Sequence, residues 1–201
     1  MYPKIKRVLD VVLSSFALIV LSPIIGLFML LIFLEDGGPP IFKQTRIGEN
    51  GKEFVFYKLR TMRVSAEDER KTESVINQNE SDGPVFKIKD DPRITKIGKF
   101  LRKSSMDELP QLINILKNEM SIVGPRPALP GEVACYNDYQ RQRLMCKPGL
   151  TCYWQTTPSR NDVLFDDWVE MDLKYIREKS FKVDCMIVLK TFKIIFTLDS
   201  R

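Results

Sequence analysis

The sequence predicts an α+β fold that is predominantly helical and associated with a membrane. Three observations lead to this prediction: an uncharged apolar run over residues 11–34, one β-hairpin marked by an Asn-Gly turn, and helical apolar periodicity in much of the remainder. The 201 residues, 44% of them hydrophobic and 28% charged, suit one medium-sized domain with a buried core. We expect a membrane segment over residues 1–36 and a folded domain over residues 37–201.

The apolar run is long enough to cross a bilayer. As one helix it would rise about 36 Å, against about 30 Å for a hydrocarbon core. Pro23 disturbs it because proline lacks the N–H that would bond the Ile19 carbonyl, and Ser22 can instead bond back to the carbonyl of Leu18 or Ile19. Two interpretations stay open here. A kinked spanning helix would carry the rest of the chain across the membrane, whereas a re-entrant helix-break-helix at Ser22-Pro23 would keep both ends on one side.

The middle of the chain predicts a short hairpin followed by helices. Residues 40–47 and 53–61 read as two strands joined through Gly48-Glu49-Asn50-Gly51, and Asn-Gly is the strongest short-range hairpin signal. Residues 65–83 are polar and acidic, which predicts an exposed helix or a loop. Residues 99–118 predict one helix whose buried stripe consists of Leu109, Leu112, Ile113 and Leu116.

Three further helices are predicted towards the C-terminus. The first runs from about Gly131 to the stop signals at Lys147-Pro148-Gly149. The second is marked by the apolar spacing of Phe165, Val169, Leu173 and Ile176. The third, over residues 181–198, is apolar but carries Lys182, Lys190 and Lys193. Lysines on an apolar helix are typical of an amphipathic helix at a membrane surface, and a core helix is the alternative.

Composition excludes several classes of site. The chain has no histidine, so a Ser-His-Asp triad, an H-E-x-x-H zinc site and a Cys₂His₂ finger are all excluded. The four cysteines form no C-x-x-C motif, which favours reduced thiols in a cytoplasmic setting. The net charge of +5 arises between Lys87 and Lys103, where seven Lys/Arg stand against two Asp. This basic segment points to phosphates, nucleic acid or lipid headgroups as partner, with a solvated face as the alternative.

The segment Ser105-Met106-Asp107-Glu108 allows two interpretations. Ser105-x-x-Glu108 matches a capping box, in which Glu108 would fold back onto the Ser105 N–H. Alternatively, Asp107 and Glu108 begin a helix, point about 100° apart and serve one bound ion. Hard oxygen ligands combined with a phosphate substrate would favour Mg²⁺.

Several cationic side chains are candidates for phosphate binding. Arg126 lies between Pro125 and Pro127, which restrict the backbone, and arginine suits bidentate phosphate recognition. A solvent-facing arginine in a Pro-rich connection is the alternative. The weaker candidates are Lys58, Arg60, Arg102 and Arg160.

The combination of motifs resembles the bacterial sugar transferase family, the monotopic phosphoglycosyl transferases. The resemblance extends along most of the chain and rests on several motifs in a fixed order. These are Arg7-Val8-Leu9-Asp10, Ser22-Pro23, Pro40-Ile41-Phe42-Lys43-Gln44-Thr45-Arg46-Ile47-Gly48, Phe56-Tyr57-Lys58-Leu59-Arg60-Thr61-Met62, Asp91-Pro92-Arg93-Ile94-Thr95, Gly98-Lys99-Phe100-Leu101-Arg102, Asp107-Glu108-Leu109-Pro110-Gln111-Leu112, Val123-Gly124-Pro125-Arg126-Pro127 and Lys147-Pro148-Gly149-Leu150-Thr151.

The resemblance implies a reaction. A sugar 1-phosphate would move from a UDP-sugar to polyprenyl (undecaprenyl) phosphate with release of UMP, as the first membrane step of exopolysaccharide, O-antigen or glycoconjugate biosynthesis. By position, Asp107 resembles the nucleophile that forms a phosphosugar-aspartyl intermediate, and Glu108 resembles its partner carboxylate linked to Mg²⁺. Contacts to substrate phosphate and uridine are implied for Lys58, Arg102, Pro125, Arg126 and Arg160.

The resemblance also implies where the protein works. It favours the re-entrant helix, with a catalytic domain on the cytoplasmic face of the inner (plasma) membrane and amphipathic helices at the surface. The partners would be UDP-sugar, polyprenyl phosphate and membrane lipid, without nucleic acid, and homodimer formation stays open. The chain is similar to the minimal catalytic form of the family. Two other functions remain as hypotheses: a non-catalytic membrane-surface scaffold, and a metal-dependent nucleotide-sugar diphosphate hydrolase.

Overall fold

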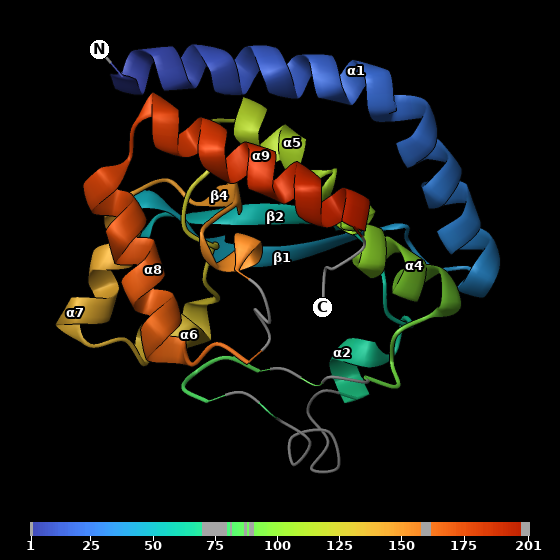
Figure 1. Ribbon diagram of the computed structural model, residues 1–201. Helices are drawn as coiled ribbons and strands as arrows, with labels where there is room; N and C mark the ends of the chain where they lie inside the picture. The colour runs from blue at the N-terminus through green and yellow to red at the C-terminus, as the bar shows by residue number, and fades with distance from the viewer. Residues whose placement is uncertain are drawn as a thin grey trace.

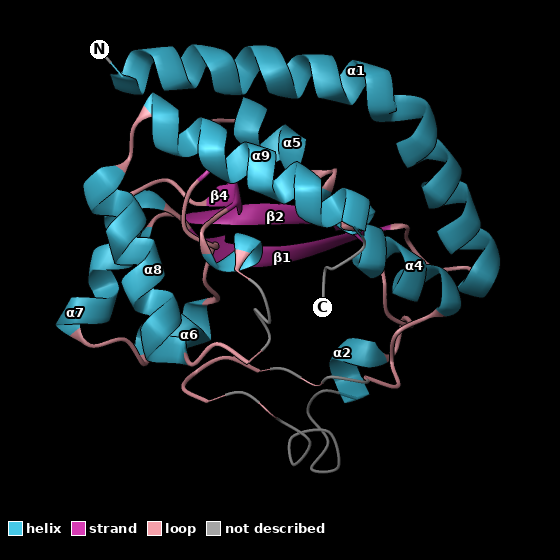
Figure 2. Cartoon of the chain, in the orientation of Figure 1, coloured by secondary structure: helices cyan, strands magenta, loops and turns pink. Residues whose placement is uncertain are grey.

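The computed structural model describes residues 2–69, 80, 82–86, 88, 91–157 and 162–197. Helices surround two small sheets, as Figure 2 shows. The helices and strands are α1 (Tyr2–Asp36), β1 (Ile41–Ile47), β2 (Glu53–Leu59), α2 (Ala66–Glu69), α4 (Lys96–Ser104), α5 (Gln111–Leu116), β3 (Ser121–Val123), α6 (Pro130–Ala134), α7 (Asp138–Arg141), β4 (Gly149–Thr151), α8 (Phe165–Glu178) and α9 (Phe181–Thr197). Short 3₁₀ turns are η1 (Glu49–Gly51), η2 (Met106–Glu108), η3 (Gln142–Met145) and η4 (Trp154–Thr156). The predicted mostly helical α+β class is confirmed.

α1 is one bent helix that meets the rest of the molecule at both of its ends. Figure 1 shows it arching along one side of the molecule and then turning towards α4. Helix continues through Pro23, and Ser22 Oγ donates a hydrogen bond to the Ile19 carbonyl at 2.9 Å. Proline inside a helix is a common cause of such a bend. The expected interruption at Ser22-Pro23 is therefore a bend within a single helix, and two separate helices are not seen.

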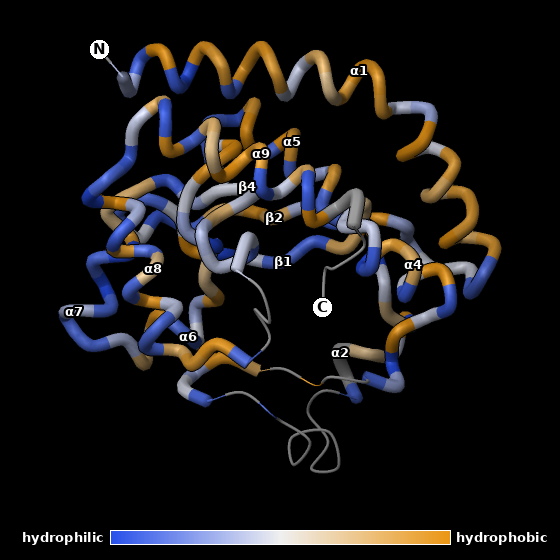
Figure 3. The backbone as a smooth tube through the Cα atoms, viewed as in Figure 1, coloured by the Kyte–Doolittle hydropathy of each residue, from blue (hydrophilic) through white to orange (hydrophobic). Residues whose placement is uncertain are grey.

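The surface of α1 is apolar and largely uncovered. Only 6% of its most apolar 18-residue window is buried inside the molecule, which distinguishes it from the core helix of a soluble protein. Figure 3 shows the hydrophobic colouring over most of its length. The helix is long and apolar enough to cross a membrane, and these properties fit a membrane-bound protein.

The N-terminal half of α1 is held by polar contacts. Arg7 donates to the carbonyls of Ile115 (2.6 Å) and Leu116 (3.0 Å) at the end of α5, and Asp10 accepts the Ile122 N–H at 3.0 Å. The first turns are attached to α9 by a further hub, in which Asp184 accepts hydrogen bonds from Tyr2, Lys6 and Tyr175.

The C-terminal half of α1 is held mainly by apolar packing. Ile32 packs with the fully buried Leu59 and Leu101, from β2 and α4. Asp36, the last residue of the helix, forms an ion pair with Arg60. Both ends of the apolar helix are thus attached to the same folded body.

The predicted hairpin is confirmed. β1 and β2 pair antiparallel, with register from Ile41 opposite Leu59 to Ile47 opposite Glu53. The turn requires left-handed backbone at Asn50 (φ 56°) and Gly51 (φ 77°), which Asn and Gly adopt most readily. The second strand ends at Leu59, two residues before the predicted end.

Two glycines bring the short parallel pair β3 and β4 into close contact. A Cβ atom on Gly149 would lie 2.0 Å from the Gly124 nitrogen, and one on Gly124 would lie 2.3 Å from the Lys147 carbonyl oxygen. Gly149 N–H donates to the Pro125 carbonyl at 2.8 Å. This crossing fixes the backbone from which Arg126 extends.

The helix predicted over residues 99–118 is wrong as a single element. Ser105 has φ 56°, which ends α4, and the chain continues through η2 before α5 begins at Gln111. The expected stripe is also wrong at Ile113, which is exposed, because the broken helix turns a different face inwards. The buried side chains of α5 are Gln111, Leu112, Asn114 and Ile115.

The C-terminal predictions are confirmed in part. The helix expected over residues 131–147 is instead divided into α6, α7 and η3, so that prediction is wrong. α8 carries the predicted stripe, with Phe165, Val169 and Leu173 buried. α9 follows the expected range to Thr197, and Leu198 lies outside the described residues. On α9, Ile187 is fully buried while Leu189 and Phe192 are exposed, so the helix is partly core and partly an uncovered apolar surface.

Candidate active site

A cavity of about 1040 Å³ lies between the hairpin, α4, η2 and the loop that follows β3. Both strands of the hairpin line it, and the lining residues Phe42, Gln44 and Arg46 share one face of β1, because side chains on one face of a strand recur every second position. Six of the candidate residues from the sequence also line it: Lys58, Arg60, Arg102, Asp107, Glu108 and Arg126. Ligand pockets usually enclose about 300–1,000 Å³, so this cavity has room for a large ligand.

Asp107 is the most enclosed of these candidates. It is 2% exposed, in η2, and its Oδ2 lies 2.6 Å from Lys58 Nζ on β2. The lysine side chain is 25% exposed, so its ammonium reaches the cavity as well as the carboxylate. A carboxylate oxygen at the wall of a cavity can attack phosphorus or bind a metal ion.

The structure contradicts the capping-box interpretation. Ser105 is in the left-handed region, whereas an N-cap residue is normally extended, and its side chain makes no capping hydrogen bond to η2. Glu108 is half-buried at the cavity wall, and its Oε2 accepts a hydrogen bond of 3.5 Å from Gln155 Nε2. The two adjacent carboxylates therefore line a cavity instead of capping a helix.

Arg102 lies close enough to Asp107 for their charges to interact. Its Nε donates to Thr61 Oγ1 at 2.9 Å. Burial lowers the pKa of the Arg102 guanidinium, while the charges of Asp107 and Asp91 raise it. Arginine remains protonated under such shifts, so the cavity keeps a fixed positive charge beside its carboxylate.

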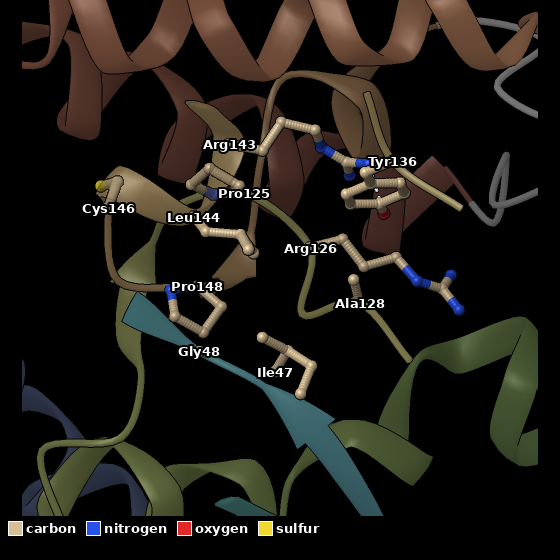
Figure 4. Close-up of a pocket in the computed structure, with 10 residues that line it drawn as sticks. All are labelled: Ile47, Gly48, Pro125, Arg126, Ala128, Tyr136, Arg143, Leu144, Cys146 and Pro148. Carbon is tan, nitrogen blue, oxygen red and sulfur yellow. Dashed lines mark hydrogen bonds between the residues drawn. The ribbon is translucent and has the colours of Figure 1, made fainter. Parts of the chain in front are cut away.

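Arg126 is oriented by two tryptophans. Its guanidinium lies 5.8 Å from the Trp154 ring centre and 5.5 Å from that of Trp168, and the two indoles stack at 4.4 Å. The neighbouring pocket drawn in Figure 4 has a volume of only about 10 Å³, which is water-sized. In that view Arg126 extends away from the other labelled side chains, while Arg143 and Tyr136 are joined by a hydrogen bond of 2.9 Å.

Two of the candidate binding residues are not brought into the large cavity. Pro125 lines the small pocket, and the structure gives it a backbone role through its bond from Gly149. Arg160 lies outside the described residues. The basic segment divides between surfaces: Arg93, Lys99, Arg102 and Lys103 line the cavity, whereas the Lys96 N–H donates to Glu35 at the end of α1.

Sequence reasoning missed several cavity residues. Arg93 and Asp91 form a buried ion pair at 2.6 Å, and Arg46 donates to the Pro127 carbonyl at 2.9 Å. Gln155 and Trp154 also line the cavity. Period-two alternation on the first strand, where Gln44 and Arg46 share a face, could have indicated Arg46. Asp91 and Arg93 are only two positions apart, whereas Trp154 and Gln155 come from a segment far in the sequence from the hairpin and leave no local signal.

The residues fit a magnesium site in which the phosphates of a bound substrate supply part of the coordination. Among the described residues, no group of three or more His, Cys, Asp or Glu side chains is placed to hold a metal alone. Mg²⁺ is usually bound by one or two carboxylates together with substrate phosphates. Asp107 and Glu108 are adjacent carboxylates lining a cavity with room for such phosphates.

Comparisons with known proteins agree with the sequence motifs. The sequence model of the bacterial sugar transferase family matches residues 1–198. The chain is 46% identical over 190 residues to the galactosyl transferase CpsE of Streptococcus agalactiae serotype III, covering 94% of this chain and 42% of that protein. It is 39% identical over 203 residues to the undecaprenyl-phosphate galactose phosphotransferase of Salmonella typhimurium, covering 97% and 41%.

A shorter relative is covered more completely. Identity to the exopolysaccharide production protein ExoY of Sinorhizobium fredii is 42% over 190 residues, covering 92% of this chain and 83% of that protein. The chain thus spans about two fifths of the length of CpsE and of the Salmonella protein, and most of the length of ExoY.

Proposed function

The chain belongs to the bacterial sugar transferase family, and we propose that it transfers a sugar 1-phosphate from a UDP-sugar to polyprenyl phosphate with release of UMP. The names of its relatives support this choice: one is an undecaprenyl-phosphate galactose phosphotransferase, another an exopolysaccharide production protein. The observation in this chain that carries the proposal is the enclosed Asp107 carboxylate, paired with Lys58 at the wall of the 1040 Å³ cavity.

The proposed first displacement uses Asp107 as the nucleophile. One carboxylate oxygen attacks the phosphorus that carries the sugar, the bond from that phosphorus to the UMP oxygen breaks, and UMP leaves with the electron pair. The product is a phosphosugar-aspartyl intermediate. A covalent intermediate divides one difficult transfer into two easier displacements.

The second displacement returns the enzyme to its starting state. A phosphate oxygen of the polyprenyl phosphate attacks the same phosphorus, and the bond to Asp107 breaks. The product is a lipid-linked sugar diphosphate, and the carboxylate is free again. The Lys58 ammonium reaches the cavity, so it can stabilise negative charge on Asp107 and then on the phosphate. Arg102 and Arg126 supply further positive charge beside the phosphates.

The proposed cofactor is Mg²⁺, which Asp107 and Glu108 would hold together with the substrate's phosphates. When bound, it would neutralise negative charge on the diphosphate. Gln155 supports this placement by donating to Glu108 Oε2 at 3.5 Å, which holds the carboxylate at the cavity wall.

We also propose that α1 is re-entrant, so that both ends and the cavity lie on the cytoplasmic face. Its first turns are bonded to α9 through Asp184, and its last turn is paired with Arg60, so both ends are attached to one folded body. A helix that crossed the bilayer would place these two attachments on opposite sides of a hydrocarbon core of about 30 Å.

The test of the reaction is UMP release from a panel of UDP-sugars in the presence of undecaprenyl phosphate and Mg²⁺. We expect turnover with at least one sugar, and a phosphosugar adduct on Asp107 when the acceptor is omitted. Asp107→Asn should abolish UMP release. Glu108→Gln should lower turnover at least about a hundredfold, a typical loss when a charge-stabilising group is removed.

The same assay separates the two alternative functions. A non-catalytic scaffold would bind anionic vesicles without releasing UMP from any sugar. A diphosphate hydrolase would release UMP continuously in detergent that contains no prenyl phosphate. Turnover retained in Asp107→Asn would contradict the assignment of the nucleophile.

The topology has its own test. Impermeant reagents should label a cysteine probe at the N-terminus and one at Lys99 from the cytoplasmic side of sealed inner-membrane vesicles. Labelling of the two probes from opposite sides would contradict the re-entrant helix.

A further inference from the structure

The two ends of the cavity differ in chemistry, and the hairpin gives the distance between them. The cavity follows β2 from Phe56 to Arg60, and β1 continues it to Arg46, which is opposite Phe54. The six residue-to-residue steps from 54 to 60 span about 20 Å of extended chain. Lys58, the partner of Asp107, lies between these limits.

The end near Arg46 is polar and aromatic. Trp154 lines the cavity, and Arg126 lies against its ring. The next residue, Gln155, reaches from there to Glu108 beside Asp107. Arg46 reaches this end by donating to the Pro127 carbonyl, next to Arg126 in the chain. An aromatic face, an amide and guanidinium groups suit a nucleotide, which has a planar base and phosphates.

The end near Arg60 continues onto the membrane helix. Pro39, Ile41 and Phe100 line the cavity there. Phe100 is 54% exposed, and its ring centre lies 5.8 Å from that of Phe28 on α1. Figure 1 shows α4 beside the second half of α1, where large apolar side chains are exposed: Leu27, Leu30, Phe33 and Leu34.

The same end carries positive charge on α4. Lys99 and Lys103 are exposed and line the cavity on either side of Phe100 and Arg102 in the sequence. α4 packs closely against Thr61 at this end. Gly98 lies so near that a Cβ there would be 2.0 Å from the Thr61 carbonyl oxygen, and Arg102 Nε donates a hydrogen bond to the Thr61 hydroxyl. A ligand with an anionic head and a long apolar tail matches ammonium groups that adjoin an exposed apolar surface.

We propose that this end of the cavity, formed by Pro39, Ile41 and the α4 residues Lys99, Phe100 and Lys103, binds the prenyl phosphate acceptor. The α4 lysines bind its phosphate, and its chain lies along Phe100 and the exposed face of α1. The inference rests on the proposed function, since it assigns one of that reaction's two substrates to a part of the cavity. The nucleotide then occupies the opposite end, and both phosphates meet at Asp107.

Photolabelling of the full chain tests the site without needing turnover. A farnesyl phosphate with a diazirine in its chain would be irradiated with the protein in detergent micelles, and the labelled peptides identified by mass spectrometry. We expect label on the segments around Ile41 and Phe100, with competition by undecaprenyl phosphate. Label at Trp154 or on α9 instead would overturn the proposal, as would equal competition by inorganic phosphate, which would indicate a simple anion site.

Kinetics of variants test the same assignment in the working enzyme. Phe100→Ser and Lys99→Glu should each raise the KM for undecaprenyl phosphate about tenfold, the effect of losing one good contact, while the KM for the UDP-sugar stays the same. Phe100→Leu should restore the acceptor KM. Lys190→Glu makes the same charge change on α9, outside the cavity, and should alter neither KM. Equal changes in both KM values, or an equal effect of Lys190→Glu, would overturn the proposal.

The two proposals fail in distinguishable ways. If no UDP-sugar yields UMP, the proposed reaction is wrong, and the photolabel still reports whether a prenyl phosphate binds beside α4. If UMP is released but the label and the acceptor KM do not follow Phe100 and Lys99, only the acceptor site is wrong.

Discussion

Two buried carboxylates in this chain each face a cation, but the two cations differ in how much of them is enclosed. Asp107 is 2% exposed and lies 2.6 Å from Lys58 Nζ, and Asp172 is 1% exposed and lies 2.7 Å from Arg143 Nη2. The Lys58 side chain is 25% exposed at the cavity wall, whereas that of Arg143 is 4% exposed.

The enclosed pair belongs to the core and the open pair to the site. Arg143 also donates to Tyr136 Oη, and its guanidinium lies 5.2 Å from the Trp168 ring centre. These neighbours prevent a substrate from reaching the guanidinium. Lys58 borders the large cavity and can exchange its carboxylate partner for a phosphate. Exposure of the cation, more than burial of the carboxylate, therefore distinguishes a candidate catalytic pair from a structural one.

The largest expected effect is on stability, at the enclosed pair. Asp172→Ala would leave the Arg143 guanidinium buried without its carboxylate, and we expect a loss of about 3–5 kcal/mol in the free energy of unfolding. Urea unfolding in detergent micelles measures it. Glu170→Gln, on the exposed side of the same helix, should change stability by no more than about 0.5 kcal/mol. A loss below about 1 kcal/mol for Asp172→Ala would remove the distinction drawn here.

A smaller loss of stability and a large loss of activity are expected at the open pair. In Lys58→Met, water in the cavity can solvate Asp107, so the free energy of unfolding should fall by only about 1 kcal/mol. Turnover should fall about a hundredfold, because the variant lacks the Lys58 ammonium that would stabilise negative charge on the transferred phosphate. Steady-state UMP release measures this effect. Lys117→Met is the control, since that exposed lysine contacts Tyr57 on the same strand outside the cavity, and full activity in Lys58→Met would contradict the comparison.

The smallest effect is a decline in stability at alkaline pH that arises beside the enclosed pair. Burial raises the pKa of Cys152 from 9.0 to about 12, and that of Tyr136 from 10.0 to about 12. The pKa values of both groups are higher in the folded protein than in the unfolded chain. Their contribution to the free energy of unfolding is therefore complete below about pH 9 and is lost as the pH rises towards 12. Between pH 8 and pH 10 we expect a loss of about 1–2 kcal/mol.

The control for this pH dependence lies in the other cysteines. Cys152→Ala should reduce the decline measured by urea unfolding, whereas Cys135→Ala, at an exposed thiol, should leave it unchanged. An equal decline in all three proteins would show that other groups are responsible.

Local signals in the sequence predicted the elements that depend on local chemistry. The Asn50-Gly51 turn sets the hairpin because its left-handed backbone is intrinsic to those residues. The stripe of α8 follows from regular apolar spacing. The left-handed backbone of Ser105 has no such signal, since serine rarely adopts a positive φ. The capping-box pattern of Ser105 and Glu108 did mark a helix boundary there, but the apolar spacing over residues 99–118 predicted one continuous helix.

The candidate site was predicted through motifs more than through geometry. Lys58 and Asp107 are 49 positions apart, and only their motifs suggested that both bind the substrate. A separation of 29 positions likewise hides the pair of Arg143 and Asp172, for which the sequence offered no motif. Pro125 is the opposite case: the substrate contact that its motif implies stays a prediction, and the structure shows its carbonyl accepting the Gly149 N–H, which joins the end of β3 to β4.

Attachment of α1 at both ends also constrains how the protein adapts to its bilayer. A free spanning helix matches a thicker or thinner membrane by changing its tilt. Here Asp184 and Arg60 fix the two ends relative to one rigid body, so the depth of the apolar arc is set by the fold. In the proposed re-entrant arrangement the lipids must adjust to the protein, so bilayer thickness should change the proposed UMP release and not the orientation of α1.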